Sequence, residues 1–373
     1  MTSGPLVLFD QGPLPGGTLF DAPHRLIEAW TAEEVAPALA AMEQAQAAGQ
    51  WLAGSASYEL GYVLSPKLAP RLPPDRREPL LRFGVFDAPR PPDPDPAPQP
   101  CGLGPLVPDW SRATYARAFD RVHAYLASGD IYQANLTMPL RGRLTGDAYA
   151  LYARLRARQP VPYGAYLDLG GMRLLSRSPE LFFAMSATGQ LRTRPMKGTM
   201  RRGATPDEDA ALKAALAASD KNRAENLMIT DLLRNDFGRI ARIGSVRVPQ
   251  LFAVETYATV HQMVSEVTAE ILPGMGLADI LAAVFPCGSI TGAPKIRAME
   301  IIAELEPTPR GSYCGAIGWI APDGAMEFSV AIRTLICDPD GGVTLNVGGG
   351  LVHDSTAEGE YDEALLKASF ATL

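Results

Sequence analysis

Residues Leu191–Arg202 read Leu-Arg-Thr-Arg-Pro-Met-Lys-Gly-Thr-Met-Arg-Arg. Four arginines in this stretch surround one lysine, Lys197, which directly precedes a glycine. A lysine held among other cations loses proton affinity, and the neutral amine that results is a nucleophile. Taken alone, the stretch favours a basic surface loop that binds an anion, because strongly perturbed lysines are the minority case. The rest of the chain decides between the two interpretations.

The composition of the chain limits its partners. It has 373 residues, of which 47% are hydrophobic and 20% charged, an ordinary globular balance. A net charge of −7 argues against a general nucleic-acid binder, so an anionic ligand would need a local basic pocket. The four cysteines lie far apart and predict reduced thiols, without a disulfide framework or zinc site. Neither a leader pattern nor a membrane-length apolar run occurs, so we expect a soluble, cytoplasmic protein.

A proline-rich segment divides the chain into two parts. Residues 88–108 contain the run Pro89–Pro98. Clustered prolines have no backbone N–H groups to form the hydrogen bonds of a β-sheet, so we expect an extended connector. Residues 1–109 show no catalytic pattern, whereas residues 110–373 hold every candidate site residue. Apolar periodicity and capping boxes predict helices at 31–48, 115–128, 205–219, 221–236 and after 355, and strands at 6–9, 51–58, 174–183, 244–265, 313–319 and 330–336.

Two polar residues stand in strand-like runs. Glu180 lies between a proline and Leu-Phe-Phe, where partial desolvation would raise the pKa of its carboxyl and suit a general acid. A glutamate at a strand edge that points to water is the simpler local interpretation. Gln133 is a neutral amide in another such run, and an ordinary solvated strand position is again the simpler interpretation.

Glu225 and His261 each allow a functional and a purely structural interpretation. Glu225 borders the apolar face of its helix, and a carboxylate turned inward needs a partner or a metal. An ion pair with Lys221 or Arg223 would satisfy it equally. His261 lies in an apolar run, where a lone histidine is most often a hydrogen-bonded core residue.

The last third of the chain adds groups that suit an anionic ligand. Arg333 is a lone charge in an apolar run, which we interpret as a strand whose guanidinium fork binds a carboxylate. Gly348–Gly350 follows a strand and would expose backbone N–H groups. On the final helix, Glu360, Glu363 and Lys367 share one face.

Together these residues suggest a site for a small dianion. Glu225 and Glu363 would form a hard-oxygen site of the kind that magnesium uses, and would hold one carboxylate of the ligand. Arg333 and backbone N–H groups would hold the other. The run Cys287–Lys295 lacks P-loop spacing, so it does not indicate a nucleotide site of that kind.

Seven segments, taken in order, resemble the chorismate-utilising enzymes. This family includes the large subunits of anthranilate and aminodeoxychorismate synthases and the isochorismate and salicylate synthases. The resemblance covers about residues 110–370 and is loose before that. It implies an α/β fold of two mainly antiparallel sheets packed face to face with helices outside, in which the connector crosses the surface. The segments are Gly129–Thr137, Ser178–Phe182, Arg194–Thr199, Arg223–Gly238, Phe285–Glu300, Gly311–Gly318 and Gly348–Glu363.

Three features resemble the branch that aminates chorismate at C4, the step towards para-aminobenzoate and folate. Lys197 occupies a Pro-x-Lys-Gly-Thr slot in which anthranilate synthases carry alanine. Gln133 stands where the water-adding members carry a lysine that activates water. The run Arg223–Asp236 also reads like the aminating branch.

The resemblance implies a role for each candidate. Glu225 and Glu363 would bind Mg²⁺, which holds the ring carboxylate of chorismate, and Glu360 would act through water. Glu180 would protonate the departing C4 hydroxyl while Lys197 attacks C2, and ammonia would then attack C4 and expel the lysine. Tyr313, Arg333 and the backbone near Gly350 would hold the enolpyruvyl carboxylate, with His261 and Thr199 along the ring. The implied substrate-binding residues are Tyr313, Arg333, Gly348, Gly350, Thr199, His261, Gln133 and Lys367.

The resemblance also implies partners. The chain ends at Leu373, just after the last motif, so we expect ammonia from a separate glutamine amidotransferase subunit or from solution. A downstream aminodeoxychorismate lyase would eliminate pyruvate from the product. Two alternatives are anthranilate synthase component I and a non-catalytic chorismate-binding subunit that regulates a partner.

Overall fold

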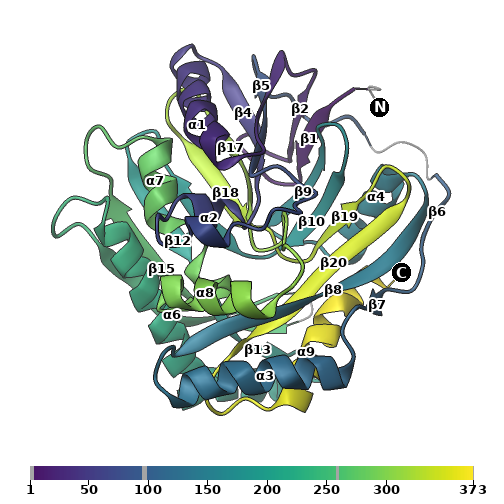
Figure 1. Cartoon of the computed structure of the whole chain (residues 1–373), viewed down its shortest axis with the longest axis vertical. Helices are drawn as coiled ribbons and strands as arrows, with labels where there is room; N and C mark the ends of the chain where they lie inside the picture. Colours follow the sequence, from purple (N-terminus) through teal and green to yellow (C-terminus); the bar gives the residue numbers. More distant parts are fainter. Residues whose placement is uncertain (1–3, 95–98, 258–259, 373) are drawn as a thin grey trace.

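The structure is a computed structural model that describes residues 4–94, 99–257 and 260–372, so residues 95–98 of the expected connector lie outside the described residues. Two antiparallel sheets pack face to face and carry helices on their outer sides (Figure 1), as the sequence predicts. None of the described helices has the length and apolarity needed to cross a membrane. All four cysteines are free thiols, and three of them are buried.

The elements have the following bounds. The first sheet contains β16 (Gly292–Ala293), β8 (Gln133–Gly146), β20 (Gly342–Leu351), β19 (Thr334–Cys337), β10 (Arg173–Ser178), β9 (Tyr163–Asp168), β1 (Leu6–Phe9) and β2 (Thr18–Asp21) in spatial order, with β6 (Cys101–Leu103) and β7 (Val107–Pro108) added on β8. The second contains β13 (Met196–Arg201), β15 (Val260–Glu270), β12 (Gln190–Arg194), β11 (Leu181–Met185), β18 (Met326–Val330), β17 (Ala316–Ile320), β4 (Trp51–Ala56), β5 (Leu81–Phe86) and β3 (Arg25–Ala29), with β14 (Arg247–Thr256) added on β15. The helices are α1 (Ala32–Ala47), α2 (Leu60–Val63), α3 (Arg112–Ala127), α4 (Ala148–Arg158), α5 (Pro206–Ala218), α6 (Asp220–Gly238), α7 (Leu277–Val284), α8 (Lys295–Leu305), α9 (Ala357–Ala368), and the short 3₁₀ turns η1 (Ala69–Arg71), η2 (Gly288–Ile290) and η3 (Ser369–Ala371).

Apolar side chains form three layers of core. Between the sheets, Val7, Phe20 and Leu167 of the first sheet pack with Phe86 and Ile317 of the second. Helices α1, α2, α6 and α7 cover the outer face of the second sheet, α3, α4 and α9 cover that of the first, and α8 packs beside β8 and β16. Each large apolar side chain buried in these layers contributes about 1.5–3 kcal/mol relative to exposure. Strands from residues 6–86 pair with strands from residues 163–330, so the sheets are shared along the chain.

A buried ion pair joins the start of the chain to β10. Arg177 is fully buried, and its guanidinium donates to Asp10 and to the Gln159 carbonyl, the latter at 2.8 Å. The Tyr152 hydroxyl donates to the other Asp10 oxygen at 2.6 Å. Because the pair is enclosed, each charge depends on its partner rather than on water.

Replacement of Asp10 by asparagine is expected to lower the free energy of unfolding by about 3–5 kcal/mol, because it leaves the Arg177 charge buried and uncompensated. Urea denaturation of the two proteins measures the difference. The matched control is Asp168→Asn, which breaks a more exposed pair with Arg173 and is expected to cost about 0–1 kcal/mol. Equal losses in the two variants would contradict this interpretation of the buried pair.

Candidate active site

Lys197 lies on a β-bulge. Strand β13 pairs Met196 with Val264 and Thr199 with Gln262 of β15, so one extra residue is accommodated on β13. Gly198, within this bulge, has a φ of +90°, a conformation that favours glycine. Bulges re-aim side chains beside active sites. A Cβ added to Gly350 of β20 would lie only 3.1 Å from the Lys197 amine, which places that amine against the glycine strand.

The pKa of Lys197 is lowered, as the sequence suggests, but the neighbouring arginines are not the cause. Burial is the largest cause and Lys367 adds to it, whereas Glu225, Glu180 and Glu363 oppose the shift. Three carboxylates that the sequence singled out therefore act electrostatically on the amine.

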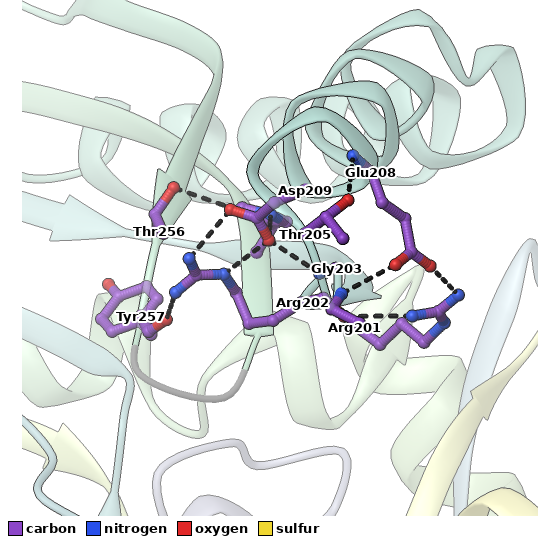
Figure 2. Close-up of polar contacts among 10 residues, drawn as sticks. Arg201, Arg202, Gly203, Thr205, Glu208, Asp209, Thr256 and Tyr257 are labelled. Atoms are coloured by element: carbon purple, nitrogen blue, oxygen red, sulfur yellow. Dashed lines mark hydrogen bonds and ion pairs between the residues drawn. The ribbon is translucent and has the colours of Figure 1, made fainter.

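The neighbouring arginines are paired with carboxylates of their own. Arg201 contacts Glu208 at 2.6 Å, and Arg202 contacts Asp209 at 2.7 Å, both at the start of α5 (Figure 2). Arg194 likewise pairs with Glu255 and Glu266. The charges of these three arginines are therefore compensated, and burial rather than these arginines lowers the pKa of Lys197.

His261 contacts the same carboxylate, Asp209, that pairs with Arg202. Its side chain is buried, with Nε2 2.9 Å from Asp209 Oδ1 and Nδ1 3.0 Å from Thr256 Oγ1. Arg202, Gly203 N–H and His261 together hold the pKa of the Asp209 carboxyl well below its usual range. The hydrogen-bonded core setting expected of a lone histidine is thus what the structure shows. Thr199, nearby on β13, is exposed and donates to Gln262 at 3.1 Å.

Glu180 is buried in the turn between β10 and β11, with 5% of its surface exposed, so it does not point to water from a strand edge. Burial raises the pKa of its carboxyl to about 7, against the opposing effects of Ser289, Lys197 and Arg333. The Ser289 hydroxyl donates to Glu180 Oε1 at 2.7 Å. A carboxyl that holds its proton near neutral pH suits a general acid.

Arg333 lies between strands β18 and β19, not within one strand as expected. Its φ of +50° is rare for a residue with a side chain, and it marks a sharp turn of the backbone. Burial lowers the pKa of its guanidinium, and Glu180 opposes that shift. The turn therefore places a desolvated cation near the acid.

The loop that carries Tyr313 is braced by two glutamates that the sequence did not indicate. Glu59 accepts from the N–H groups of Arg310 at 2.7 Å and Gly311 at 3.0 Å, and Glu78 accepts from that of Ser312 at 3.1 Å. Burial raises the pKa of Glu59 to about 7. Tyr313 itself is buried, and burial raises the pKa of its hydroxyl well above the usual value.

The glycine run lies inside β20 rather than after a strand, which corrects the expectation. Gly348 pairs with Thr137 and Gly350 with Asn135 of β8, whereas the described pairing of β20 with β19 involves only Val343–Leu345. The Lys367 amine reaches this strand and donates to the Gly348 carbonyl at 2.9 Å. A Cβ at Gly349 would come within 2.8 Å of Glu360 Oε2, and one at Gly350 within 3.0 Å of the Gln133 amide, so the glycines leave space for these side chains.

Gln133, the first residue of β8, is fully buried, and neither amide atom has a hydrogen-bond partner among the described residues. A Cβ on Gly350 would lie 3.0 Å from the Gln133 amide and 3.1 Å from the Lys197 amine, so both groups flank one glycine. A buried amide without partners is costly. The arrangement therefore points to a ligand that completes its hydrogen bonds, and it does not match a solvated strand position.

The carboxylates proposed for a metal come from two helices. Glu225 lies on α6, and Glu360 and Glu363 lie on α9. Ser355 donates to Glu360 at 2.6 Å, and the Lys367 amine contacts Glu363 at 2.9 Å. Within residues 4–94, 99–257 and 260–372, no group of three or more His, Cys, Asp or Glu side chains is already arranged to hold a metal ion.

The chemistry of these donors nevertheless fits a hard cation. The Lys367 ammonium group already lies between the Glu363 carboxylate and the Gly348 carbonyl, at 2.9 Å from each oxygen. Carboxylate oxygens are the ligands that Mg²⁺ takes in proteins, together with water and substrate oxygens. Glu225 and Glu363 both raise the pKa of the Lys197 amine, so carboxylates of both helices act on the same group.

Comparison with known proteins gives a consistent picture. The family description "chorismate binding enzyme" matches residues 8–372. Aminodeoxychorismate synthase component 1 of Klebsiella aerogenes is 47% identical over 259 residues, 69% of this chain and 57% of that protein. The protein of the same name in Bacillus subtilis is 42% identical over 271 residues, 72% of this chain and 57% of that protein. This chain therefore spans less than two thirds of the length of these curated relatives.

Solved structures share the fold at lower identity. Anthranilate synthase component I from Streptococcus pneumoniae superimposes with a TM-score of 0.79 at 23% identity, over 100% of this chain and 93% of that one. A putative isochorismate synthase from Bacillus anthracis gives 0.79 at 20% identity, over 100% and 96%. These likenesses concern the architecture of the two sheets and their helices.

Proposed function

The chain belongs to the family of chorismate-binding enzymes, and from this membership we propose that it aminates chorismate at C4 with ammonia. The product would be 4-amino-4-deoxychorismate, the precursor of para-aminobenzoate and folate. The observation that carries the proposal is the convergence of Lys197, of lowered pKa, with the buried acid Glu180 and the unpartnered amide of Gln133. The names of the relatives at 42–47% identity support the same activity.

Substrate binding uses the charges on either side of Lys197. Arg333, Tyr313 and the backbone at Gly348 and Gly350 bind the enolpyruvyl carboxylate, because a desolvated guanidinium suits a carboxylate. Glu225 and Glu363 would hold Mg²⁺, with Glu360 acting through water. The metal supplies charge neutralisation for the dianionic substrate. Lys367, Thr199, His261 and Gln133 complete the lining of the site.

The chemistry has two steps. Glu180, protonated near pH 7, gives its proton to the C4 hydroxyl, which leaves as water. The neutral Lys197 amine forms a bond to C2 as the ring double bonds shift and the C4–O bond breaks. Ammonia then forms a bond to C4 while the double bonds shift back and the C2–N bond to Lys197 breaks. Hydroxide is a poor leaving group, so acid and nucleophile must act together.

Other proteins act before and after this step. A separate glutamine amidotransferase supplies ammonia, and an aminodeoxychorismate lyase removes pyruvate from the product, both in the cytoplasm. The designation "component 1" of the relatives supports a partner subunit.

Incubation of the protein with chorismate, Mg²⁺ and excess ammonium salt is expected to yield 4-amino-4-deoxychorismate, identified by chromatography and mass spectrometry. Ammonium salt replaces the glutaminase, so the test needs this chain alone. Anthranilate as the main product would support anthranilate synthase component I instead. Chorismate that binds but never reacts, even with a glutaminase added, would support a regulatory subunit and refute catalysis.

A further inference from the structure

Glu180 has a buried hydrogen-bond partner, Ser289, that lies far from it in the sequence. Ser289 lies in η2, and only 3% of its surface is exposed. Its hydroxyl donates to Glu180 Oε1 at 2.7 Å, and the Cys287 thiol lies 3.3 Å from the same hydroxyl. Since Oε1 accepts this bond, a proton on the carboxyl is directed to Oε2.

The backbone of η2 is fixed by a second buried residue. Arg310 donates through Nη1 to the carbonyl of Ile290, the neighbour of Ser289, at 3.2 Å, and through Nη2 to that of Asn135 at 2.6 Å. Two more bonds, each 2.8 Å, join its guanidinium to Glu306. One planar fork therefore ties the turn that carries Ser289 to strand β8.

We propose that Ser289 is a positioning residue for the acid, and that Arg310 acts behind it by fixing the backbone of η2. In this arrangement the serine hydroxyl occupies one oxygen of Glu180 and leaves the other to deliver the proton. The role of the acid rests on the proposed amination of chorismate, whereas the contact itself does not.

The contact also has an electrostatic consequence. The titratable and charged groups that face Glu180 are Lys197 on β13, Arg333 between β18 and β19, and Cys287 before η2. Burial raises the pKa of the Cys287 thiol to about 12, so that group stays neutral. A hydroxyl that donates to a carboxylate stabilises its charged form, so Ser289 limits how far burial raises the pKa of Glu180.

The first experiment titrates the carboxyl in the ligand-free protein by infrared spectroscopy with carbon-13-labelled glutamate. Glu180→Gln identifies the band that belongs to Glu180. In Ser289→Ala that band is expected to titrate about one pH unit higher than in the wild type, because the bond to the charged form is lost. An unchanged titration in Ser289→Ala would overturn the proposal.

The second experiment measures amination with ammonium as the nitrogen source. Ser289→Ala is expected to lower kcat about 10²-fold with KM nearly unchanged, because the acidic proton of Glu180 is no longer held on Oε2. Ser289→Thr, which keeps the hydroxyl, is expected to recover most of the rate. Ser176→Ala is the matched control, since Ser176 is a buried serine that accepts from Thr334 at 2.9 Å.

The two experiments separate this proposal from the proposed function. A wild-type protein that does not aminate chorismate refutes the function but leaves the infrared comparison valid. A similar loss of rate in Ser176→Ala, or a Ser289→Ala variant as active as the wild type, contradicts the positioning role in an enzyme whose function holds. Arg310→Lys, which loses the planar fork but keeps the charge, is expected to reproduce part of the infrared shift.

Discussion

Replacement of Lys197 by alanine is expected to lower the rate of chorismate amination by several orders of magnitude. The amine lies beside Gly350, its pKa is lowered mainly by burial, and a neutral amine is required for attack on C2. The variant removes the nucleophile while leaving Glu180 and Arg333 in place. Substrate affinity should therefore change far less than kcat, because neither carboxylate of chorismate is assigned to Lys197.

Intact-mass analysis provides the second measurement on this residue. Wild type mixed with chorismate in the absence of ammonia is expected to gain the mass of chorismate minus one water, located on Lys197 by peptide mapping. The control Lys213→Ala removes an exposed lysine from α5 and should behave as the wild type. A near-normal rate in Lys197→Ala would refute the nucleophilic role.

Local sequence rules predicted many of the elements around this site. The strand Leu6–Phe9 has the bounds expected from its apolar run, and α1 begins at the capping box of Thr31 and Glu34. Such signals lie within a few residues of each other. Sheet order depends on residues that are far apart in the sequence, since β4 pairs with β17 across more than half of the chain. The resemblance to a family, rather than periodicity, supplied the two-sheet architecture.

Errors arose where one residue departs from a regular pattern. The apolar residues that flank Arg333 predict one strand through it, but its positive φ separates β18 from β19. The sequence predicts that the glycine run Gly348–Gly350 follows a strand and exposes backbone N–H groups. In the structure Gly349 and Gly350 are strand residues whose missing side chains leave space for Glu360, Lys367 and Lys197.

Non-local partners were the least predictable part of the site. Nothing near Glu180 in the sequence indicates Ser289, and nothing near Asp10 indicates Arg177. The acids that compensate Arg201 and Arg202 lie on the following helix, so spacing alone does not show that these charges are paired. Burial and pairing depend on the fold, whereas composition and spacing show only which charges are available.

Replacement of Glu180 by glutamine is expected to lower amination about 10²- to 10⁴-fold, the usual contribution of a general acid. Glutamine keeps the shape of the side chain and can still accept from Ser289, but it has no proton to give at neutral pH. The matched control is Glu327→Gln on β18. Burial also raises the pKa of Glu327, but its charged neighbour is Arg192 rather than Lys197 or Arg333.

The pH dependence of the wild type tests the same assignment. Burial raises the pKa of Glu180 to about 7, so the carboxyl carries its proton below about pH 7 and loses it above. The rate should therefore fall as the pH rises beyond 7, by about tenfold per unit once most of the acid is ionised. Protonation of Lys197 also removes the nucleophile, and burial lowers the pKa at which this protonation occurs. An alkaline limb that persists in Glu180→Gln would assign the proton to another group, because the variant has no carboxyl at position 180 to titrate.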